Sequence, residues 1–201
     1  TLLREADGTP TLVSLPLPGG RVLNAQVWIA DVGRVPLLLL DSNIPKNDEI
    51  SRQVTDRLYR GSAEHRLEQE LLLGMGGIRA LRAFERITGS PRPQVYHCNE
   101  GHAGFLSVER LREILETDST MDFKSAVEAV RSGTLFTTHT PVPAGIDRFD
   151  KNVVRPYLAA IPLPGVEVED VLTLGKESYE GGNPHVFNMA VLGLRMARMA
   201  N

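Results

Sequence analysis

The sequence predicts an α/β fold with a parallel, Rossmann-like sheet and a β-hairpin near the N-terminus. Two apolar stretches, residues 94–98 and 134–138, each end in a polar turn, and helical periodicity fills the chain between them. A strand–helix–helix–strand order at this spacing is a crossover unit, so we expect the two strands to be parallel. The hairpin is indicated by two apolar runs on either side of Gly33.

The hairpin strands differ in pattern. Residues 22–29 alternate in part between apolar and polar side chains, whereas residues 35–40 are almost wholly apolar. We therefore expect the second strand to be the more buried of the two. Residues 1–20 are rich in Gly and Pro and predict irregular chain or a short edge strand, and residues 41–56 predict a polar loop.

A long amphipathic helix is predicted over residues 63–87, with Ser62 as its N-cap. Apolar residues recur along it at spacings of three and four: Leu67, Leu71, Met75, Ile78, Leu81 and Phe84. Three glycines interrupt the pattern at Gly74, Gly76 and Gly77. We interpret them as close helix–sheet packing in preference to a kink or a break that faces a ligand.

Four further helices are predicted in the second half of the chain. One begins near His102, and a second is capped by Asp122 and stopped by Gly133. A short helix is expected around residues 152–159, and a final one over residues 187–199. The inward face of the final helix is predicted to carry Phe187, Ala190, Val191 and Leu194.

Composition excludes several classes of protein. Of the 201 residues, 42% are hydrophobic and 23% are charged, which is ordinary for a globular domain. The net charge is -3 and the basic residues are scattered, so neither a nucleic acid nor a membrane surface is an expected partner. The single cysteine, Cys98, cannot form an intrachain disulfide and is compatible with a cytoplasmic protein. Cys98 and Trp28 are both interpreted as core residues.

Polar residues cluster where the two predicted parallel strands end. They are Asn99, Glu100, His102, Thr138, His139 and Thr140. Ligands of open α/β sheets bind beyond the carboxyl ends of the strands, so these residues predict one polar pocket. Uncharged donors and acceptors suit a hydroxylated substrate. The alternative is that Asn99 and Glu100 only cap the following helix, with His102 as a donor in its first turn.

A metal site is not expected at this position. His97 and His102 are five residues apart across a strand-to-helix break, so neither helix nor strand periodicity places them on one face. No fourth ligand joins them and Glu100. A pair of glycosidase carboxylates formed by Glu100 and Asp147 is not predicted either, because nothing in the sequence sets their separation.

Six stretches resemble the bacterial α-glucan phosphorylases in the same order along the chain. The two most specific are His-Cys-Asn-Glu-Gly-His-Ala-Gly-Phe at residues 97–105 and Phe-Thr-Thr-His-Thr-Pro-Val-Pro-Ala-Gly at residues 136–145. The others lie at residues 34–41, 55–59, 69–81 and 187–194. The resemblance extends over roughly residues 20–200, and phosphorylases are several times longer. It therefore implies that residues 1–201 form part of the N-terminal, glucan-side domain of a two-domain GT-B glycosyltransferase.

The reaction implied by the resemblance is phosphorolysis. Inorganic phosphate displaces the terminal glucose of an α-1,4-glucan and gives glucose 1-phosphate with retained configuration. The family's pyridoxal phosphate is bound to a lysine of the C-terminal domain, which this chain lacks. None of Lys46, Lys124, Lys151 and Lys176 stands in a matching motif. We expect the isolated chain to be inactive, and the exposed edges of a truncated sheet to favour a homo-oligomer or partial disorder.

The resemblance also implies roles for individual residues. Glu100 and His102 match an acidic residue and a histidine that line the pocket beside the reacting glucose. His139 matches a histidine whose carbonyl oxygen faces the sugar near the anomeric carbon and whose imidazole reaches the 6-hydroxyl. A fixed dipole at that place would stabilise an oxocarbenium-like transition state.

Two more residues match the loop that lies over the family's site. Tyr59 stands where the family has this mobile loop, and its aromatic face could hold a glucose ring, with core packing as the alternative. Arg66 matches a basic residue beside the loop, with a structural ion pair as the alternative. The chain departs from the family at Arg60 and Ser62, where smaller or acidic residues are usual.

Two other functions remain open at this point. A nucleotide-sugar glucan synthase shares the two-domain architecture, but its Lys-Thr-Gly-Gly-Leu-Gly fingerprint does not occur in this chain. A non-catalytic carbohydrate-binding module is the second alternative. Replacement of His139 would leave phosphorolysis intact if that alternative were correct.

Overall fold

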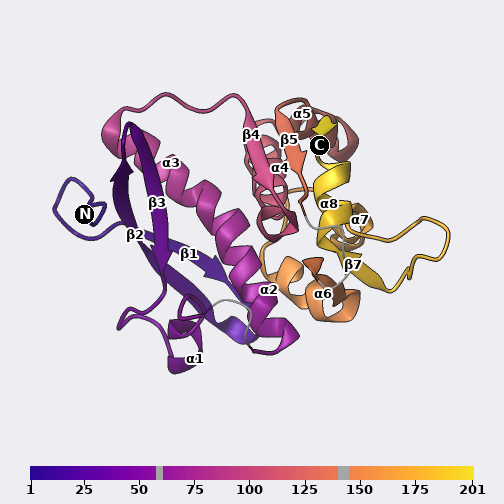
Figure 1. Ribbon diagram of the computed structural model, residues 1–201, viewed down its shortest axis with the longest axis horizontal. Helices are drawn as coiled ribbons and strands as arrows, with labels where there is room; N and C mark the ends of the chain where they lie inside the picture. The colour runs from indigo at the N-terminus through magenta and orange to yellow at the C-terminus, as the bar shows by residue number, and fades with distance from the viewer. Residues whose placement is uncertain (58–60, 140–144) are drawn as a thin grey trace. The chain divides into compact units, whose positions relative to one another are not determined.

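A computed structural model describes residues 1–57, 61–139 and 145–201 of the chain (Figure 1). Two of the predicted site residues, Tyr59 and Thr140, lie outside these ranges. The chain divides into two compact units, Thr1–Arg92 and Pro93–Asn201, which are described here one at a time. The first unit contains an antiparallel sheet and the second a parallel one, so the predicted α/β class with an N-terminal hairpin is confirmed.

The first unit is built on a three-stranded antiparallel sheet of order β1-β2-β3. Its strands are β1 (Leu12–Pro16), β2 (Val22–Val32) and β3 (Val35–Asp41). The predicted hairpin is confirmed: β2 and β3 pair from Val32↔Val35 at the turn to Gln26↔Asp41 at the far end. Gly33 has φ +63° in that turn, a left-handed conformation that favours glycine. Residues 1–20 were predicted to form irregular chain or a short edge strand, and they contain an edge strand, β1.

One face of this sheet is buried and the other is open. Side chains that alternate along β1 and β2 form the buried face: Val13, Leu15, Leu23, Ala25 and Val27. On the opposite face Trp28 is 39% exposed, and its partner in β3, Leu39, is 46% exposed. The expectations that β3 is the more buried strand and that Trp28 lies in the core were therefore wrong. An apolar run does not reveal which face of its strand another layer covers.

The predicted long helix is confirmed, with a local irregularity where the glycines stand. It consists of α2 (Ala63–Leu71), a π-helical turn (Leu72–Gly76) and α3 (Gly77–Thr88). The Ser62 side chain accepts a hydrogen bond from the N–H of His65 at 3.3 Å, so the predicted N-cap is also confirmed. A Cβ on Gly76 would lie 3.5 Å from Leu40 of β3, which agrees with close helix–sheet packing.

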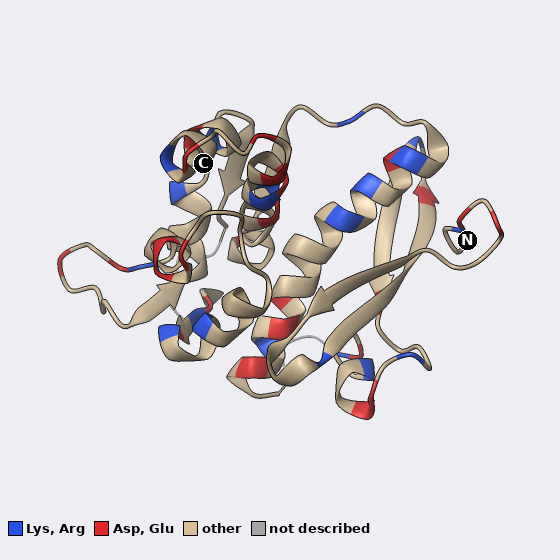
Figure 2. Cartoon of the chain, turned by 180° about the vertical axis from the view of Figure 1, so that it is seen from behind, with Lys and Arg blue, Asp and Glu red and all other residues tan. Residues whose placement is uncertain are grey.

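Basic residues recur along α3 (Figure 2). Arg79 donates to the carbonyl oxygen of Ser14 at 2.6 Å, and Arg86 forms a bidentate pair with Glu5. These arginines therefore connect the helix to β1 and to the segment that precedes it. The polar segment after β3 contains one further helix, α1 (Glu49–Arg52), which the loop prediction for residues 41–56 missed.

The second unit is built on a three-stranded parallel sheet of order β4-β5-β8. Its strands are β4 (Tyr96–Asn99), β5 (Thr134–Thr137) and β8 (Met199–Ala200). The crossover from β4 to β5 contains a short 3-10 turn (Gly101–Ala103), α4 (Leu106–Thr117) and α5 (Phe123–Ser132). The predicted parallel pairing is confirmed, and so is the cap of α5, where Asp122 accepts from the N–H of Ser125 at 2.7 Å.

The remainder of the second unit matches the prediction less closely. Its elements are β6 (Arg148–Asp150), α6 (Lys151–Ala160), α7 (Val168–Leu174), β7 (Val186–Asn188) and α8 (Met189–Arg195). The short helix expected at residues 152–159 is α6, whereas β6 and α7 were not predicted. The prediction of a single helix over residues 187–199 was wrong, because Phe187 lies in β7 and Met199 begins β8.

The inward face predicted for that final helix was also wrong in part. Leu194 is 50% exposed, and the buried face of α8 carries Met189 and Leu192. Asn188 explains where the helix begins. Its side chain accepts from the N–H groups of Ala190 and Val191, so it caps α8 directly after β7.

Two glycines give a matched test of the packing in helices. Gly193 of α8 lies against Phe136 of β5, and a Cβ there would be 2.3 Å from the buried ring. We expect Gly193→Ala to lower the free energy of unfolding by about 2 kcal/mol. Gly77 begins α3 with open space around its Cβ position, so Gly77→Ala is expected to be neutral or to stabilise by up to about 1 kcal/mol. Urea unfolding of the purified variants, followed by circular dichroism, measures both; equal effects at the two sites would contradict the described packing.

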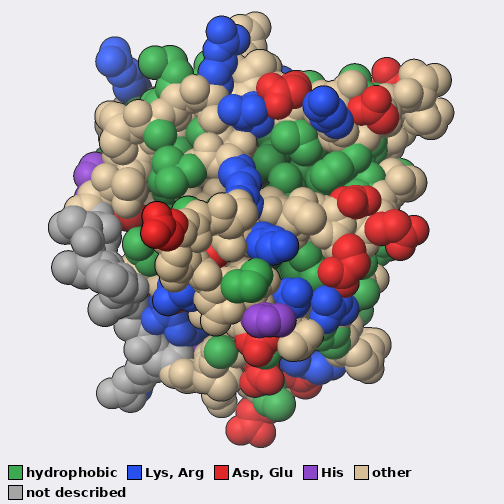
Figure 3. Space-filling model, turned by 90° about the vertical axis from the view of Figure 1, so that its right-hand side faces the viewer, with side chains coloured by type: hydrophobic (Ala, Val, Ile, Leu, Met, Phe, Trp, Pro, Cys, Tyr) green, Lys and Arg blue, Asp and Glu red, His purple; other side chains and the backbone are tan. Residues whose placement is uncertain are grey.

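Two properties of the described residues relate to the composition of the sequence, the apolar character of their helices and the distribution of their charged side chains. None of their helices combines the length and the apolar character that a bilayer span requires. On the face seen in Figure 3, basic, acidic and apolar side chains are interspersed. The scattered charge noted in the sequence is therefore also scattered on this face.

Candidate functional site

The candidate site lies in the second unit, at the carboxyl ends of β4 and β5. Asn99 is the last residue of β4, and Thr138 and His139 directly follow β5. Because β4 and β5 are parallel and adjacent, both turns leave the same edge of the sheet. The side chains of Asn99, Thr138 and His139 are exposed there, and that of Glu100 is half-buried.

Glu100 has an unusual backbone conformation. Its φ of +64° and ψ of 171° are found almost only in glycine, and Glu100 is the one non-glycine residue with positive φ among the described residues. Its N–H donates to the carbonyl oxygen of Thr137 at 2.8 Å, which extends the β4–β5 ladder by one step. The chain then turns sharply into Gly101. A conformation of this kind costs about 1–3 kcal/mol and is maintained only where the surrounding structure enforces it.

The Glu100 carboxylate joins the two turns. One oxygen accepts the main-chain N–H of His139, and the other accepts the hydroxyl of Thr138 at 3.1 Å. The His139 ring bonds in turn through Nε2 to Oδ1 of Asn99 at 3.0 Å. Four of the predicted site residues are therefore in direct contact. The predicted convergence of the Glu100 and His139 turns is confirmed, whereas their contact with a sugar stays a prediction.

His102 lies in the short 3-10 turn just beyond this cluster. Its Nδ1 is 3.1 Å from Oδ2 of Asp147, a side chain that is only 12% exposed. A carboxylate beside one ring nitrogen fixes the orientation of a histidine and favours the tautomer protonated on that nitrogen. Asp147 follows His102 by 45 positions, and no motif or periodicity in the sequence links the two. Sequence reasoning therefore missed this partner.

The remaining predicted site residues lie in the other unit or outside the described residues. Arg66 lies in α2 of the first unit, where it is half-buried. Its place beside the substrate stays a prediction, as do the roles of Tyr59 and Thr140. The alternative that Asn99 and Glu100 only cap the following helix is not supported, because neither side chain accepts from a helical N–H in the described hydrogen bonds.

Two glycines bring this turn close to the N-terminus of α8. A Cβ on Gly101 would lie 2.9 Å from the Cβ of Met189, and one on Gly104 would lie 3.2 Å from Leu192. The N–H of Met189 donates to the carbonyl oxygen of Asp147 at 3.0 Å. The start of α8 therefore supports both the backbone at Gly101 and the residue that orients His102.

A buried carboxylate fixes the position of α8. Glu177 is fully buried and forms a bidentate ion pair with Arg148, with both distances 2.7 Å. It also accepts from the N–H of Asn183 and from the side chain of Asn188, each at 2.8 Å. The ion pair with Arg148 is the main cause that lowers the pKa of Glu177 to about 2. Because Asn188 caps α8, the network of Arg148, Glu177 and Asn188 stabilises the helix whose first residue packs against the turn at Gly101.

Cys98 and the lysines provide no further reactive group here. Cys98 is 2% exposed, as predicted, and burial raises the pKa of its thiol to about 12, so it is not a nucleophile near neutral pH. A lysine that forms a Schiff base is normally enclosed in a pocket. Lys46, Lys124 and Lys176 are exposed and Lys151 is half-buried, so none of them fits that role.

Comparison with known proteins places the whole chain beside one group of enzymes. The chain is 51% identical over 207 residues to the glycogen phosphorylase of Mycobacterium tuberculosis, an alignment that covers 100% of this chain. It is 38% identical over 199 residues to the maltodextrin phosphorylase of Thermococcus litoralis, and 30% identical over 176 residues to the glycogen phosphorylase of Aquifex aeolicus. No family model matches the chain.

The alignments cover 23%, 22% and 24% of these three relatives, so the chain spans about a quarter of their length. In each case they include most or all of this chain, at 100%, 99% and 87%. Both turns of the candidate site fall within a match of this extent. By its sequence, the chain is therefore a segment of the glycogen and maltodextrin phosphorylase family.

Proposed function

We propose that the chain is part of an α-glucan phosphorylase that releases glucose 1-phosphate from the terminal α-1,4-linked glucose of a glucan. The observation that carries the proposal is the 51% identity to a protein named glycogen phosphorylase over the full length of this chain. The joined turns of Glu100 and His139 support it, because they place polar groups at the edge of the sheet where α/β proteins bind ligands.

In this proposal the chain supplies the wall of the site that faces the sugar. The Glu100 carboxylate fixes the main chain at His139, whose carbonyl dipole stabilises positive charge that develops on the anomeric carbon. Asn99 holds the His139 ring, and Asp147 holds His102 for hydrogen bonds to hydroxyl groups. Thr138, Thr140, Tyr59 and Arg66 are proposed to bind the glucan beside them. The configuration at the anomeric carbon is retained.

The proposal extends to the complete enzyme. Residues 1–201 would belong to the N-terminal, glucan-side domain of a two-domain GT-B glycosyltransferase located in the cytoplasm. Pyridoxal phosphate, when bound in the other domain, would supply a phosphate group for proton transfer. No lysine of this chain fits as its attachment point, so we assign the cofactor to a part of the protein outside these residues. The isolated chain is then expected to be inactive.

Replacement of His139 tests the catalytic assignment. In the complete enzyme, His139→Ala is expected to lower the rate of glucose 1-phosphate release from maltoheptaose and inorganic phosphate at least tenfold, because the substitution removes the ring contact with Asn99 and loosens the turn. His185→Ala is the matched control, since His185 is an exposed histidine whose described contacts use only its main chain. The control should stay within about twofold of wild type.

Three results would contradict the proposal or a part of it. An unchanged rate in His139→Ala would favour the non-catalytic carbohydrate-binding module. Transfer of glucose from ADP-glucose by the complete enzyme, without phosphorolysis, would favour a glucan synthase. Release of glucose 1-phosphate by the 201-residue chain alone would contradict the assignment of the cofactor to another domain.

A further inference from the structure

The first unit carries an exposed aromatic side chain with a fixed orientation. Trp28 lies on the open face of the sheet and is 39% exposed. Its indole Nε1 donates to Oδ2 of Asp41 at 3.2 Å, and the same oxygen accepts from Gln26 at 2.8 Å. Gln26 and Asp41 are paired residues of β2 and β3, so the three side chains share one face. The indole edge is held while part of its surface stays in contact with solvent.

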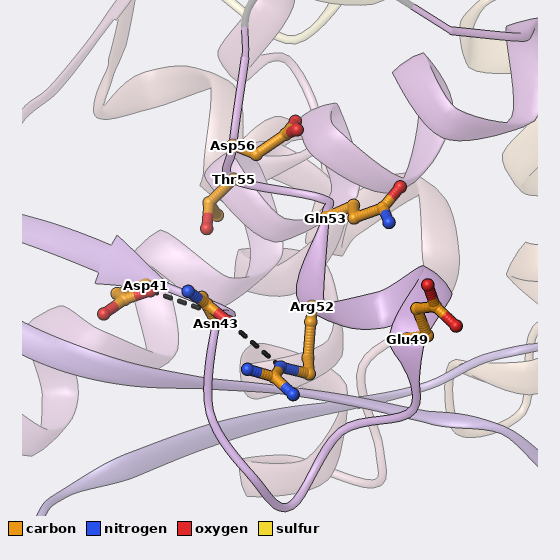
Figure 4. A pocket seen from close by; sticks show the side chains of 7 residues that line it. All are labelled: Asp41, Asn43, Glu49, Arg52, Gln53, Thr55 and Asp56. Atoms are coloured by element: carbon orange, nitrogen blue, oxygen red, sulfur yellow. Dashed lines mark hydrogen bonds between the residues drawn. The ribbon is translucent and has the colours of Figure 1, made fainter.

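A polar pocket adjoins this aromatic side chain. It has a volume of about 490 Å³ and is lined by Asp41, Asn43, Glu49, Arg52, Gln53, Thr55 and Asp56 (Figure 4). Asp41 is common to the pocket and to the Trp28 contact. Its second oxygen accepts the N–H of Asn43 at 2.9 Å, and the Asn43 side chain accepts from Nε of Arg52 at 3.0 Å. A chain of hydrogen bonds therefore runs from the indole into the pocket.

The charge of the pocket restricts what it can bind. Three carboxylates face a single guanidinium, so a phosphate or nucleotide would meet net repulsion. The carboxylates of Asp41, Glu49 and Asp56 point in different directions in Figure 4, unlike the converging ligands of a metal ion. A neutral ligand with many hydroxyl groups fits best. Such groups can donate to Asp56 and accept from Gln53 and Arg52.

We propose that Trp28 and this pocket form a second binding site for an α-1,4-glucan chain. The exposed face of Trp28 takes the apolar face of one glucose ring, and the pocket takes the hydroxyl groups of its neighbours. The choice of an α-1,4-glucan rests on the proposed function. The aromatic side chain and the polar pocket belong wholly to the first unit, and none of their residues is among those assigned to the proposed catalytic site.

The single tryptophan of the chain reports directly on this site. Titration of the 201-residue chain with maltoheptaose is expected to give a saturable change in tryptophan emission, since a sugar ring replaces water on the indole. Cellohexaose should bind at least tenfold more weakly, and inorganic phosphate should give no change. A flat titration with maltoheptaose would overturn the proposal, and so would saturation by magnesium chloride in its place.

Variants test the site by a measurement that does not depend on fluorescence. In gels that contain amylopectin, Trp28→Ala and Gln53→Ala are expected to raise the dissociation constant of the chain at least tenfold and about threefold, respectively. Gln53 is exposed, so the second variant keeps the test valid if the first folds poorly. Val35→Ala is the matched control, because Val35 is an exposed apolar residue on the same sheet face, at the turn end of β3. Equal retardation of wild type, Trp28→Ala and Gln53→Ala would overturn the proposal.

The results distinguish rejection of the second glucan site from rejection of the proposed function. Phosphorolysis by the complete enzyme, together with a flat titration of the chain, would reject the second site and leave the function intact. Binding of maltoheptaose that depends on Trp28, in a complete enzyme that releases no glucose 1-phosphate, would support the site and reject the function.

Discussion

Glu100→Ala in the complete enzyme is expected to lower kcat/KM for phosphorolysis of maltoheptaose at least a hundredfold. The substitution removes the acceptor for the N–H of His139 and for the hydroxyl of Thr138, so the two turns are no longer joined. Small displacements of groups that position a substrate have large kinetic costs, and a hundredfold loss corresponds to about 2.7 kcal/mol of transition-state stabilisation. Initial rates of glucose 1-phosphate release measure the effect.

A second variant at the same position separates function from stability. Glu100 has φ +64°, a conformation that is strained for alanine but not for glycine. Glu100→Gly should therefore be more stable than Glu100→Ala by about 1 kcal/mol, while it loses the same activity. Thermal unfolding and initial rates of the two variants test this together. Rates within threefold of wild type in both would show that the strained carboxylate has no part in catalysis.

The central part of the candidate site could be predicted because it depends on local sequence and on one topological rule. Apolar strands that end at Asn99 and at Thr137 identify the two turns, and the helices between them require parallel pairing. Parallel adjacent strands then bring Glu100 and His139 to one edge without any knowledge of tertiary contacts. The strained φ of Glu100 could not be foreseen, since glutamate normally avoids it.

The errors arose where burial depends on a layer that the sequence pattern does not specify. The run of leucines in β3 predicts a strand correctly, but Leu37 and Leu39 are nearly half exposed because no described element of the first unit covers that face. Similarly, the apolar spacing of residues 187–199 fits a helix, although Phe187 pairs with Phe149 in a strand. Short apolar runs are compatible with both structures, and the Asn188 cap decides between them.

Loss of the buried carboxylate of Glu177, which binds Arg148 and Asn188, is expected to have the largest effect on stability. Glu177→Ala should lower the free energy of unfolding by about 3–4 kcal/mol, because it leaves the buried side chain of Asn188 and the N–H of Asn183 without their acceptor and removes the partner of Arg148. Glu180→Ala is the control, since Glu180 is exposed and should change stability by less than about 0.5 kcal/mol. Urea unfolding at neutral pH measures the difference.

The same carboxylate predicts how stability depends on pH. The pKa of Glu177 is lowered from the 4.5 of a free glutamate to about 2 in the folded chain, chiefly by Arg148. Its contribution is therefore complete above pH 4.5 and is lost as the pH falls towards 2, because the unfolded chain takes up the proton first. Glu177→Gln keeps the shape but cannot titrate, so the gap between its stability and that of wild type should narrow as the pH is lowered through this range. A gap that stays constant from pH 7 to about pH 2 would show that Glu177 contributes through packing alone, and that α8 does not depend on its charge.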